Sequence, residues 1–383
     1  MTPTDPVPAA LAAAEHALRE TYGQLTLGDP VRFESSPRSL VVRATVSGSG
    51  ELPGTVIVKT HDAELAPQAC VREPAALALL GDLGCTAVPA VLAVGTTPAL
   101  VVMSDLGDHG RVSDALLWGT AEEASTSVLA WAGAMARVHA ATRGIEPVFA
   151  AALARDAHRL GVPCPDTDPT TTMLVGAADS LAGQLPRLGV EVSPEALDEL
   201  RHLDELLPRD PAVRALTPAD ACPDNNLLTA EGLSLIDFEG ASVRHLAWDA
   251  AYLTVPWPSC WCSWLIPDEV AQAALEHWRS TCGAPVGGTD FDDALRATTV
   301  GWSMTSVGWF LRKAIAEDPW SDDATRAALA APRRSLTVHR LRAVAQLADV
   351  RLPALTALAV EALTAVEAAW GPLELPLAPA FLR

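Results

Sequence analysis

One stretch of the sequence carries oxygen-bearing side chains at a spacing that suits phosphoryl transfer. In PADACPDNNLLTAEGLSLIDFEG, Asp220 is followed five positions later by Asn225, and Asp237 comes after a predicted β-turn-β segment. Phosphoryl transfer needs a carboxylate that orients an attacking hydroxyl and accepts its proton, together with oxygen ligands for Mg²⁺. Asp220 suits the first task, and Asn225 with Asp237 suits the second. The alternative interpretation is an ordinary hairpin in which the two aspartates only cap turns.

A lysine and a glutamate upstream favour the phosphoryl-transfer interpretation. Lys59 ends the apolar run Val56-Ile57-Val58, and Glu73 follows fourteen positions later on a predicted helix. In kinase-like enzymes such a strand lysine holds the nucleotide phosphates and pairs with a helix glutamate. A lysine at a strand end is more often a solvated edge residue. Its weight here comes from its combination with Glu73 and with the downstream Asp, Asn and Asp.

These residues resemble the motifs of the aminoglycoside phosphotransferase and choline kinase group in the protein-kinase-like superfamily. The resemblance spans roughly residues 25–255 in motif order. It implies that Asp220 is the catalytic base, that Asn225 and Asp237 hold Mg²⁺, and that ATP is the phosphoryl donor. Asp249 matches a later family aspartate that braces the catalytic loop by accepting backbone hydrogen bonds.

The catalytic loop departs from the usual pattern of this family. The family loop usually runs His-Gly-Asp, whereas this chain has Pro218-Ala219-Asp220. The two exchanged positions shape the loop and perform no chemistry, so activity is compatible with the change. The departure also leaves room for a weakly active or inactive member.

Two further segments are candidates for nucleotide binding. The connection between the first two predicted strands contains Ser35, Ser36 and Arg38, whose hydroxyl groups and charge could meet phosphate oxygens. It has no glycine, and a plain hairpin turn explains it equally well. The segment from Met103 through Asp105 to Leu106 would be the hinge that binds adenine through its backbone. The resemblance places all of these residues at the nucleotide.

The elements that must position these residues form two groups along the chain. Alternating apolar residues predict strands early on, and periodic apolar residues predict helices later. We expect an α+β, bilobal, protein-kinase-like fold, with an N-terminal antiparallel sheet of about five strands, one main helix in that lobe, and a larger, mostly helical C-terminal lobe. The expected domains are residues 1–107, for the nucleotide, and 108–383, for catalysis and acceptor binding. Expected strands include Leu25 to Phe33, Ser39 to Val46 and Gly54 to Thr60, and expected helices include Thr126 to Ala141, Leu197 to Leu207, Pro267 to Thr281, Thr298 to Ala314 and Ser335 to Leu347.

Composition narrows the possible partners. The 383 residues are 49% hydrophobic, so a large core can form, and the formal charge of −20 argues against a nucleic-acid partner. No apolar run reaches the roughly 18–20 residues of a membrane span, and the N-terminus does not resemble a signal peptide. We therefore expect a cytoplasmic protein with neither membrane nor nucleic acid as partner.

Cysteines and tryptophans leave two questions open. The seven cysteines are irregularly spaced, which argues against a disulfide framework. Cys222, Cys260 and Cys262 could suggest zinc, but a zinc site needs four ligands in tighter spacing, so buried thiols are the favoured interpretation.

Three tryptophans near the second aspartate could form an aromatic wall for an acceptor or, as we favour, belong to the core: Trp257, Trp261 and Trp264. His139, on the helix before residue 141, is expected to pack or cap and not to act as a base.

Three functions fit these observations. The first is an ATP- and Mg²⁺-dependent O-phosphotransferase acting on a small hydroxylated molecule, such as an antibiotic, an amino sugar or a nucleoside. The second keeps the chemistry but phosphorylates Ser or Thr of a precursor peptide during natural-product maturation. The third is a pseudokinase scaffold, which the Pro-Ala pair favours and which the retained Lys, Glu, Asp, Asn and Asp oppose. We favour the first.

Overall fold

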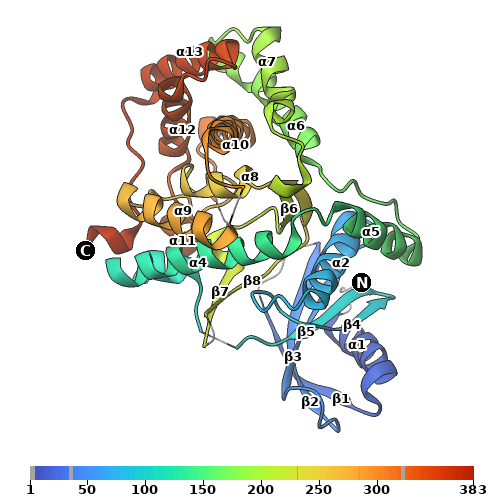
Figure 1. The fold of residues 1–383 in the computed structure, drawn as a ribbon. Helices are drawn as coiled ribbons and strands as arrows, with labels where there is room; N and C mark the ends of the chain where they lie inside the picture. Colours follow the sequence, from blue (N-terminus) through green and yellow to red (C-terminus); the bar gives the residue numbers. More distant parts are fainter. Residues whose placement is uncertain (1–4, 34–37, 108, 231, 284, 321–323) are drawn as a thin grey trace.

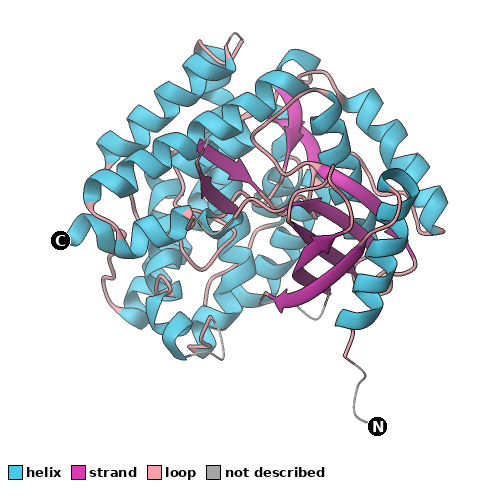
Figure 2. Cartoon of the chain, turned by 90° about the horizontal axis from the view of Figure 1, so that it is seen from below, coloured by secondary structure: helices cyan, strands magenta, loops and turns pink. Residues whose placement is uncertain are grey.

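The computed structural model describes the chain except residues 1–4, 34–37, 108, 231, 284 and 321–323. Figure 1 shows a sheet with two helices at one end of the molecule and a larger helical body at the other. Seen from below, strands gather along one side and helices cover the rest (Figure 2). The expected α+β, bilobal architecture is confirmed. The division at residues 107 and 108 stays a prediction.

The N-terminal sheet has five antiparallel strands in the order β1-β2-β3-β5-β4. Strands that follow one another in the sequence form antiparallel hairpins: β1 with β2, β2 with β3, and β4 with β5. The remaining pair, β3 with β5, is joined through a helix and β4. Hairpin connections need few residues, and the pattern matches the turn-rich segments of the sequence. The strands are β1 (Thr26–Arg32), β2 (Ser39–Ser47), β3 (Thr55–His61), β4 (Val91–Thr96) and β5 (Ala99–Ser104).

The alternating direction of the side chains along β3 decides which of them face the main cavity. Val56 and Val58 are fully buried in the cluster that joins the sheet to helix α1 (Val7–Tyr22). Ile57 and Lys59 lie on the opposite face, because successive side chains of a strand point to opposite sides. That face lines the main cavity of the molecule. The apolar run that ends in Lys59 therefore anchors the strand and delivers the lysine to the cavity.

Helix α2 (Pro67–Asp82) covers the sheet near that cavity and carries Glu73. Pro74 is the eighth residue of this helix, beyond its first two turns, and its missing N–H costs one helical hydrogen bond. A run of ten residues of α2, from Ala69 through Leu77 together with Leu80, is buried. Packing around this helix therefore compensates for a sequence that is imperfect for a helix in isolation.

The C-terminal part is built on two long helices, α4 (Ala121–Thr142) and α10 (Thr289–Ala316). Thr120 caps α4 through a capping box with Glu123. Around them pack the remaining described helices, which are α3 (Val112–Trp118), α5 (Glu146–Leu160), α6 (Thr170–Gln184), α7 (Pro194–Arg201), α8 (Ala247–Ala250), α9 (Asp268–Cys282), α11 (Ala324–Leu329), α12 (Arg333–Leu347) and α13 (Pro353–Trp370). No described helix is long and apolar enough to cross a bilayer.

Two small antiparallel sheets lie between the lobes and hold the chemistry-bearing loops. The hairpin of β7 (Asn226–Thr229) and β8 (Gly232–Leu235) was expected from the sequence. The pair of β6 (Arg214–Thr217) and β9 (Ser242–His245) was not, because each strand has only four residues and pairs across a long stretch of chain. The expected helix from Leu197 to Leu207 is wrong in length. It breaks at His202 into α7 and a short 3₁₀ turn, Leu203–Leu206.

The C-terminal core is rich in aromatic side chains. Trp248 and Trp302 meet edge to face with ring centroids 5.6 Å apart, and both are buried. A Cβ added at Gly301 would lie 2.6 Å from Cη2 of Trp248. Helix α10 therefore approaches the segment that carries Asp249 closely, and only glycine permits this approach.

The close contact at Gly301 gives a test of this packing. Gly301→Ala should lower the free energy of unfolding by about 1–3 kcal/mol, because the methyl group overpacks the tryptophan pair. Gly176→Ala is the matched control, since a Cβ at that position of α6 meets nothing within 4 Å. It should raise stability by about 0.5–1 kcal/mol through helix propensity. Urea unfolding measures both, and equal effects would contradict the packing described.

Candidate active site

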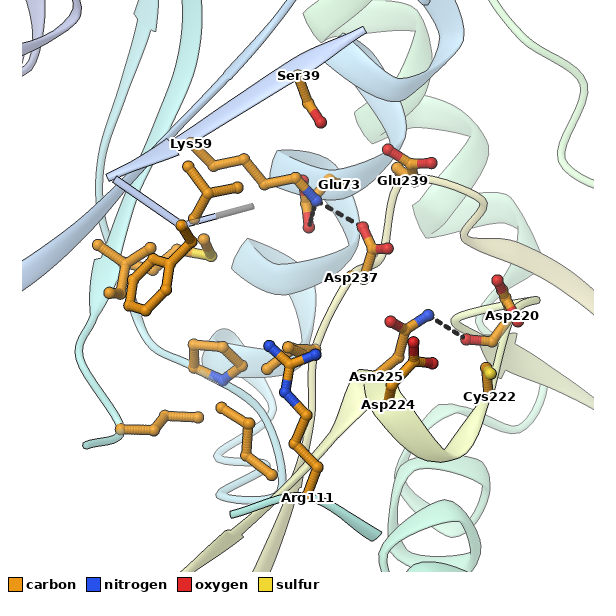
Figure 3. Close-up of a pocket in the computed structure, with 18 of the residues that line it drawn as sticks. Ser39, Lys59, Glu73, Arg111, Asp220, Cys222, Asp224, Asn225, Asp237 and Glu239 are labelled. Atoms are coloured by element: carbon orange, nitrogen blue, oxygen red, sulfur yellow. Dashed lines mark hydrogen bonds and ion pairs between the residues drawn. The ribbon is translucent and has the colours of Figure 1, made fainter. Parts of the chain in front are cut away.

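A buried cluster of opposite charges joins the sheet, helix α2 and the β7–β8 hairpin. Nζ of Lys59 lies 2.9 Å from Oε1 and 2.8 Å from Oε2 of Glu73, and 2.5 Å from Oδ1 of Asp237 (Figure 3). Glu73 also contacts His61 at 2.7 Å and accepts the backbone N–H of Phe238 at 3.1 Å. Residues from three distant segments thus meet at one ammonium group.

The charges in this cluster stabilise one another. Burial alone would lower the pKa of Lys59, but the carboxylates of Glu73 and Asp237 outweigh it and raise that pKa above its usual value. Burial alone would raise the pKa of Glu73, but the charge of Lys59 and the contact with His61 lower it to about 2. Lys59 is therefore cationic and Glu73 anionic throughout the neutral range.

The β7–β8 hairpin brings the asparagine beside the second aspartate. The backbone N–H of Ile236 donates to the carbonyl of Asn225 at 3.0 Å, just beyond the paired residues Asn226 and Leu235. Asp237 follows with a φ of +65°, a left-handed conformation that aspartate tolerates better than most residues. Figure 3 shows the side chain of Asp237 between the ammonium group of Lys59 and the side chain of Asn225.

Asp220 faces the same space from the catalytic loop. Its carboxylate is half-buried and accepts a hydrogen bond from Oγ of Ser259 at 2.7 Å. Burial raises the pKa of Asp220 to about 6, with a further increase from the charges of Asp237 and Asp224 and an opposing effect of the Ser259 hydrogen bond. Asn225 donates from Nδ2 to the Asp220 carbonyl at 3.2 Å, which ties both ends of the loop together.

Two side chains hydrogen-bond the backbone of the unusual Pro218-Ala219 pair. Ala219 has a φ of +68°, a conformation that glycine adopts without strain and alanine does not. Its carbonyl accepts hydrogen bonds from Arg244 at 3.3 Å and from the hydroxyl of Tyr252 at 3.2 Å. Tyr252 also contacts Oγ of Ser259 at 3.0 Å. These contacts fix a loop conformation that the sequence does not favour by itself.

Asp249 supports the loop indirectly. Its described partners are the side chains of Arg244, His139 and Thr217, with His139 Nε2 at 2.8 Å, and Arg244 passes the contact on to Ala219. The expected acceptance of backbone hydrogen bonds is thus replaced, among the described contacts, by a guanidinium bridge. His139 is fully buried and also accepts from Nε1 of Trp278 at 3.2 Å, which matches its expected packing role.

The expected nucleotide segments differ in how the structure places them. Met103 and Asp105 line the main cavity, and the carboxylate of Asp105 pairs with Arg43 at 2.8 Å, so this side chain is already engaged by a cation. Arg38 lines the same cavity and lies 3.5 Å from Glu239. Ser35 and Ser36 lie outside the described residues.

Two cavities meet at the aspartates. The larger one, of about 700 Å³, runs from the β3 face to the hairpin, and the smaller one, of about 350 Å³, lies beside α6 and α10. Residues that line both are Asp220, Asp237, Glu239 and Ser259. The reaction centre inferred from the sequence therefore lies where two binding spaces join.

The comparison with known protein families agrees with this geometry. The model of the phosphotransferase enzyme family matches residues 36–283, which is more than half of the chain. The chain belongs to this family. It is a kinase-like phosphotransferase with a hydroxyl group as acceptor.

One solved structure with a TM-score above 0.5 shows the shared fold, and two more are similar to the chain at lower scores. A choline/ethanolamine kinase family protein from Mesorhizobium loti is 15% identical with a TM-score of 0.53, and the match covers 94% of this chain and 99% of that one. Choline kinase from Cryptosporidium parvum Iowa II is 13% identical with a TM-score of 0.49, covering 87% and 93%. A macrolide 2′-phosphotransferase from Brachybacterium faecium is 16% identical with a TM-score of 0.44, covering 86% and 97%. No curated protein matches the sequence.

Sequence reasoning about this phosphotransferase missed the residues that support the loop. Ser259, Tyr252 and Arg244 contact the catalytic loop from outside the motifs, and no spacing rule connects them to Asp220. The signal that could have pointed to them is Ala219, because a non-glycine residue at a family glycine position requires extra support. Of the three tryptophans, Trp257 and Trp264 are buried, as favoured, while Trp261 borders the main cavity.

The buried pair of Asp249 and Arg244 gives the phosphotransferase a testable pH dependence. Burial alone would raise the pKa of Asp249, but Arg244 and His139 hold that pKa far below its usual range. A carboxylate with a lowered folded-state pKa contributes stability that is present above about pH 4 and is lost as the pH falls further. The free energy of unfolding should therefore fall more steeply between about pH 5 and pH 2 in the wild type than in Asp249→Asn.

At neutral pH, Asp249→Asn should cost about 3–5 kcal/mol, because it leaves the Arg244 guanidinium buried without its counter-charge. Asp198→Asn changes an exposed ion pair with Arg201 and should cost at most about 1 kcal/mol. Urea unfolding at each pH supplies both quantities. Equal pH slopes in the wild type and Asp249→Asn would show that Asp249 is not ionised in the folded protein.

Proposed function

We propose that this phosphotransferase transfers the γ-phosphoryl group of ATP, with Mg²⁺, to a hydroxyl group of a small molecule. The observation that carries the proposal is the position of Lys59 between Glu73 and Asp237 on the wall of a cavity that Asp220 and Asn225 also line. This set contains each charge and oxygen ligand that phosphoryl transfer requires. Small molecules of this kind include antibiotics, amino sugars and nucleosides.

The residues present suit a magnesium nucleotide. The Asn225 amide oxygen and the Asp237 carboxylate are hard oxygen donors of the kind that Mg²⁺ prefers, and they come from adjacent positions of one hairpin. Lys59 and Arg38 supply positive charge on the same cavity wall. Bound Mg²⁺ would neutralise charge on the phosphates. The hinge from Met103 to Leu106 would hold the base through its backbone groups.

Asp220 would act on the acceptor. The Asp220 carboxylate accepts from Oγ of Ser259 at 2.7 Å and from the backbone N–H of Cys222, and its remaining lone pairs could accept a hydrogen bond from the acceptor hydroxyl. A pKa of about 6 leaves Asp220 mostly ionised at neutral pH, yet makes it a stronger base than an ordinary aspartate. The hydroxyl proton would pass to Asp220 as the acceptor oxygen forms its bond to the γ-phosphorus, while the bond from that phosphorus to the bridging oxygen breaks and ADP leaves.

The smaller cavity suits the acceptor. Its volume of about 350 Å³ lies in the range of small-molecule sites, and Asp220 is among the residues that line it. Thr170, Arg244 and the rings of Trp302 and Trp309 line it. Trp309 is 40% exposed, so an aromatic face is available to a ligand. Arg244 is buried and paired with Asp249, so the exposed indole of Trp309 and the Thr170 hydroxyl support an acceptor with both apolar and polar groups.

The role of Asp220 can be tested by its isosteric amide. Asp220→Asn should lower phosphate transfer by about 10²–10⁴-fold, because the general base is lost. Binding of Mg²⁺-ATP should remain, since Asp220 is not among the proposed metal ligands. Mass spectrometry that detects a phosphate-sized gain on pooled hydroxylated small molecules, with Ser/Thr peptides as a second pool, measures transfer and identifies the acceptor class. The exposed change Glu205→Gln is the control, and full transfer by Asp220→Asn would refute the role.

Nucleotide binding gives a second test that needs no acceptor. Mg²⁺-ATP at about 100 times its dissociation constant should stabilise the folded protein by about 2.7 kcal/mol, visible as a rise in the melting temperature. The rise should shrink with EDTA in place of Mg²⁺ and in Asp237→Asn, which removes a charged metal ligand. An equal rise with and without Mg²⁺ would contradict the proposed metal site. No rise at all would favour a scaffold that does not bind nucleotide.

A further inference from the structure

Three cysteines and an aspartate gather beside the catalytic loop, at the edge of the main cavity. Cys222 and Asp224 come from the loop itself, and Cys260 and Cys262 come from the segment that follows Trp257. Their sulfur and carboxylate oxygen atoms all lie within 4.8 Å of one another. Sγ of Cys262 is 3.3 Å from that of Cys222 and 3.0 Å from that of Cys260. The sequence argument against zinc assumed that such ligands stay apart, and that assumption is wrong.

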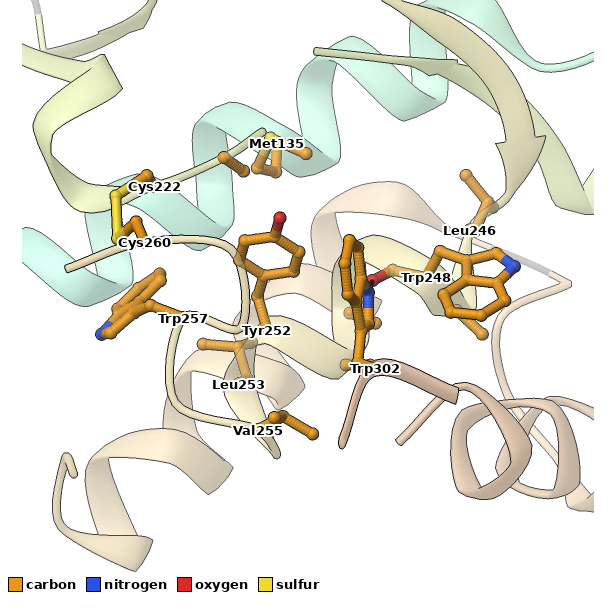
Figure 4. Close-up of a cluster of buried hydrophobic side chains, with 14 of the residues drawn as sticks. Met135, Cys222, Leu246, Trp248, Tyr252, Leu253, Val255, Trp257, Cys260 and Trp302 are labelled. Carbon is orange, nitrogen blue, oxygen red and sulfur yellow. Dashed lines mark hydrogen bonds between the residues drawn. A yellow bond between two sulfur atoms is a disulfide. The ribbon is translucent and has the colours of Figure 1, made fainter. Parts of the chain in front are cut away.

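The structure joins two of these cysteines. Cys222 and Cys260 form a disulfide, which Figure 4 shows beside Trp257 and Tyr252. The expectation of free thiols is therefore wrong for this pair, while Cys262 keeps its thiol. A reducing cell interior keeps most protein thiols reduced. A dithiol reductant would convert the pair to two thiols as it becomes a disulfide itself, and three thiols would then face Asp224.

The two loops hold these side chains firmly. Nδ2 of Asn226, which is fully buried, donates to the carbonyl of Cys222 at 2.5 Å. Oγ of Ser263, also fully buried, donates to the carbonyls of Trp257 and Cys260, each at 2.5 Å. Nε1 of Trp261 donates to one carboxylate oxygen of Asp224 at 2.8 Å and orients the other. Such outer contacts are what fixed metal ligands require.

We propose that the reduced protein binds one Zn²⁺ through Cys222, Cys260, Cys262 and Asp224. Three thiolates and one carboxylate complete the four-coordinate tetrahedral set that zinc adopts in closed structural sites. Soft sulfur donors select zinc over Mg²⁺, so this site does not compete with Asn225 and Asp237 for the same ion. Each thiol releases its proton to solvent as it binds the metal.

The electrostatics of the cluster support a cation. Three thiolates here would place their negative charge against the Asp224 carboxylate, because the four ligand atoms all lie within 4.8 Å of one another, so they would need a positive partner. The backbone N–H of Asp224 donates towards the Cys262 sulfur, which stabilises negative charge there. A divalent ion would supply the positive charge that would balance these four ligands.

The bound zinc would bridge the catalytic loop, which carries Cys222 and Asp224, and the segment that carries Cys260 and Cys262. Cys222 is two residues after Asp220, and Cys260 directly follows Ser259, which hydrogen-bonds Asp220. Zinc would thus hold Ser259 and Asp220 in register without touching the reacting groups. Cys222, Asp224 and Cys260 also border the main cavity, so the site has an entry path.

Metal analysis of the full-length protein tests the proposal without any activity measurement. The protein is purified with a phosphine reductant and without chelator, and is then dialysed against limiting Zn²⁺. Elemental mass spectrometry should then detect about one zinc per chain. Cys262→Ser should lose this zinc, because three ligands no longer make a closed site. Cys282→Ser, which removes a buried thiol in α9, is the matched control and should keep it.

Stability and thiol mapping give independent readouts. Zinc should raise the melting temperature of the reduced wild type and of Cys282→Ser, but not of Cys262→Ser. Alkylation before and after zinc should show Cys222, Cys260 and Cys262 protected together. Reduced wild type without bound zinc, or equal zinc content in Cys262→Ser, would overturn the proposal. So would a Cys222–Cys260 disulfide that persists in cells quenched directly with alkylating acid. None of these results depends on nucleotide or acceptor, so they are separable from the proposed phosphotransferase activity.

Discussion

The arrangement of this phosphotransferase depends on the ion cluster around Lys59. A lysine that is 6% exposed and a glutamate that is 1% exposed can exist as ions only if they compensate each other. Because Glu73 also binds the backbone of Phe238, the same carboxylate that fixes the lysine fixes the start of the segment after Asp237. The sheet, helix α2 and the β7–β8 hairpin therefore cannot shift independently without exposing a buried charge.

The catalytic loop is stabilised in a different way from the one its family resemblance implies. Ala219 adopts a left-handed conformation at the position of the family glycine, and Arg244 and Tyr252 hold its carbonyl. Arg244 is held in turn by Asp249, and Asp249 by His139. Strain of order 1–3 kcal/mol at such a residue persists only where surrounding contacts determine the backbone. The loss of the His-Gly pair is thus compatible with an intact loop geometry.

The sequence predicted the architecture well where periodicity is strong. The expected strands Ser39 to Val46 and Gly54 to Thr60 alternate buried apolar and less buried residues, and the long helices α4 and α10 lie over the expected ranges because their apolar positions recur every three to four residues. The four-residue strands β6 and β9 and the break at His202 were missed, because short elements are set by tertiary partners and not by their own pattern. Ser35 and Ser36 stay predictions, as do the roles assigned to each site residue.

What the sequence by itself determined is the identity and order of Lys59, Glu73, Asp220, Asn225 and Asp237, since these types at this spacing suit one chemistry. Tertiary structure alone decided which residues support them. Ser259, Arg244 and the sulfur atoms of Cys260 and Cys262 lie far from Asp220 along the chain or outside any motif, and they approach it only after the helical lobe has packed. The physical reason is that local spacing constrains residues within one turn or hairpin, whereas a buried hydrogen bond or a sulfur cluster requires closure of long loops, which only the assembled core can provide.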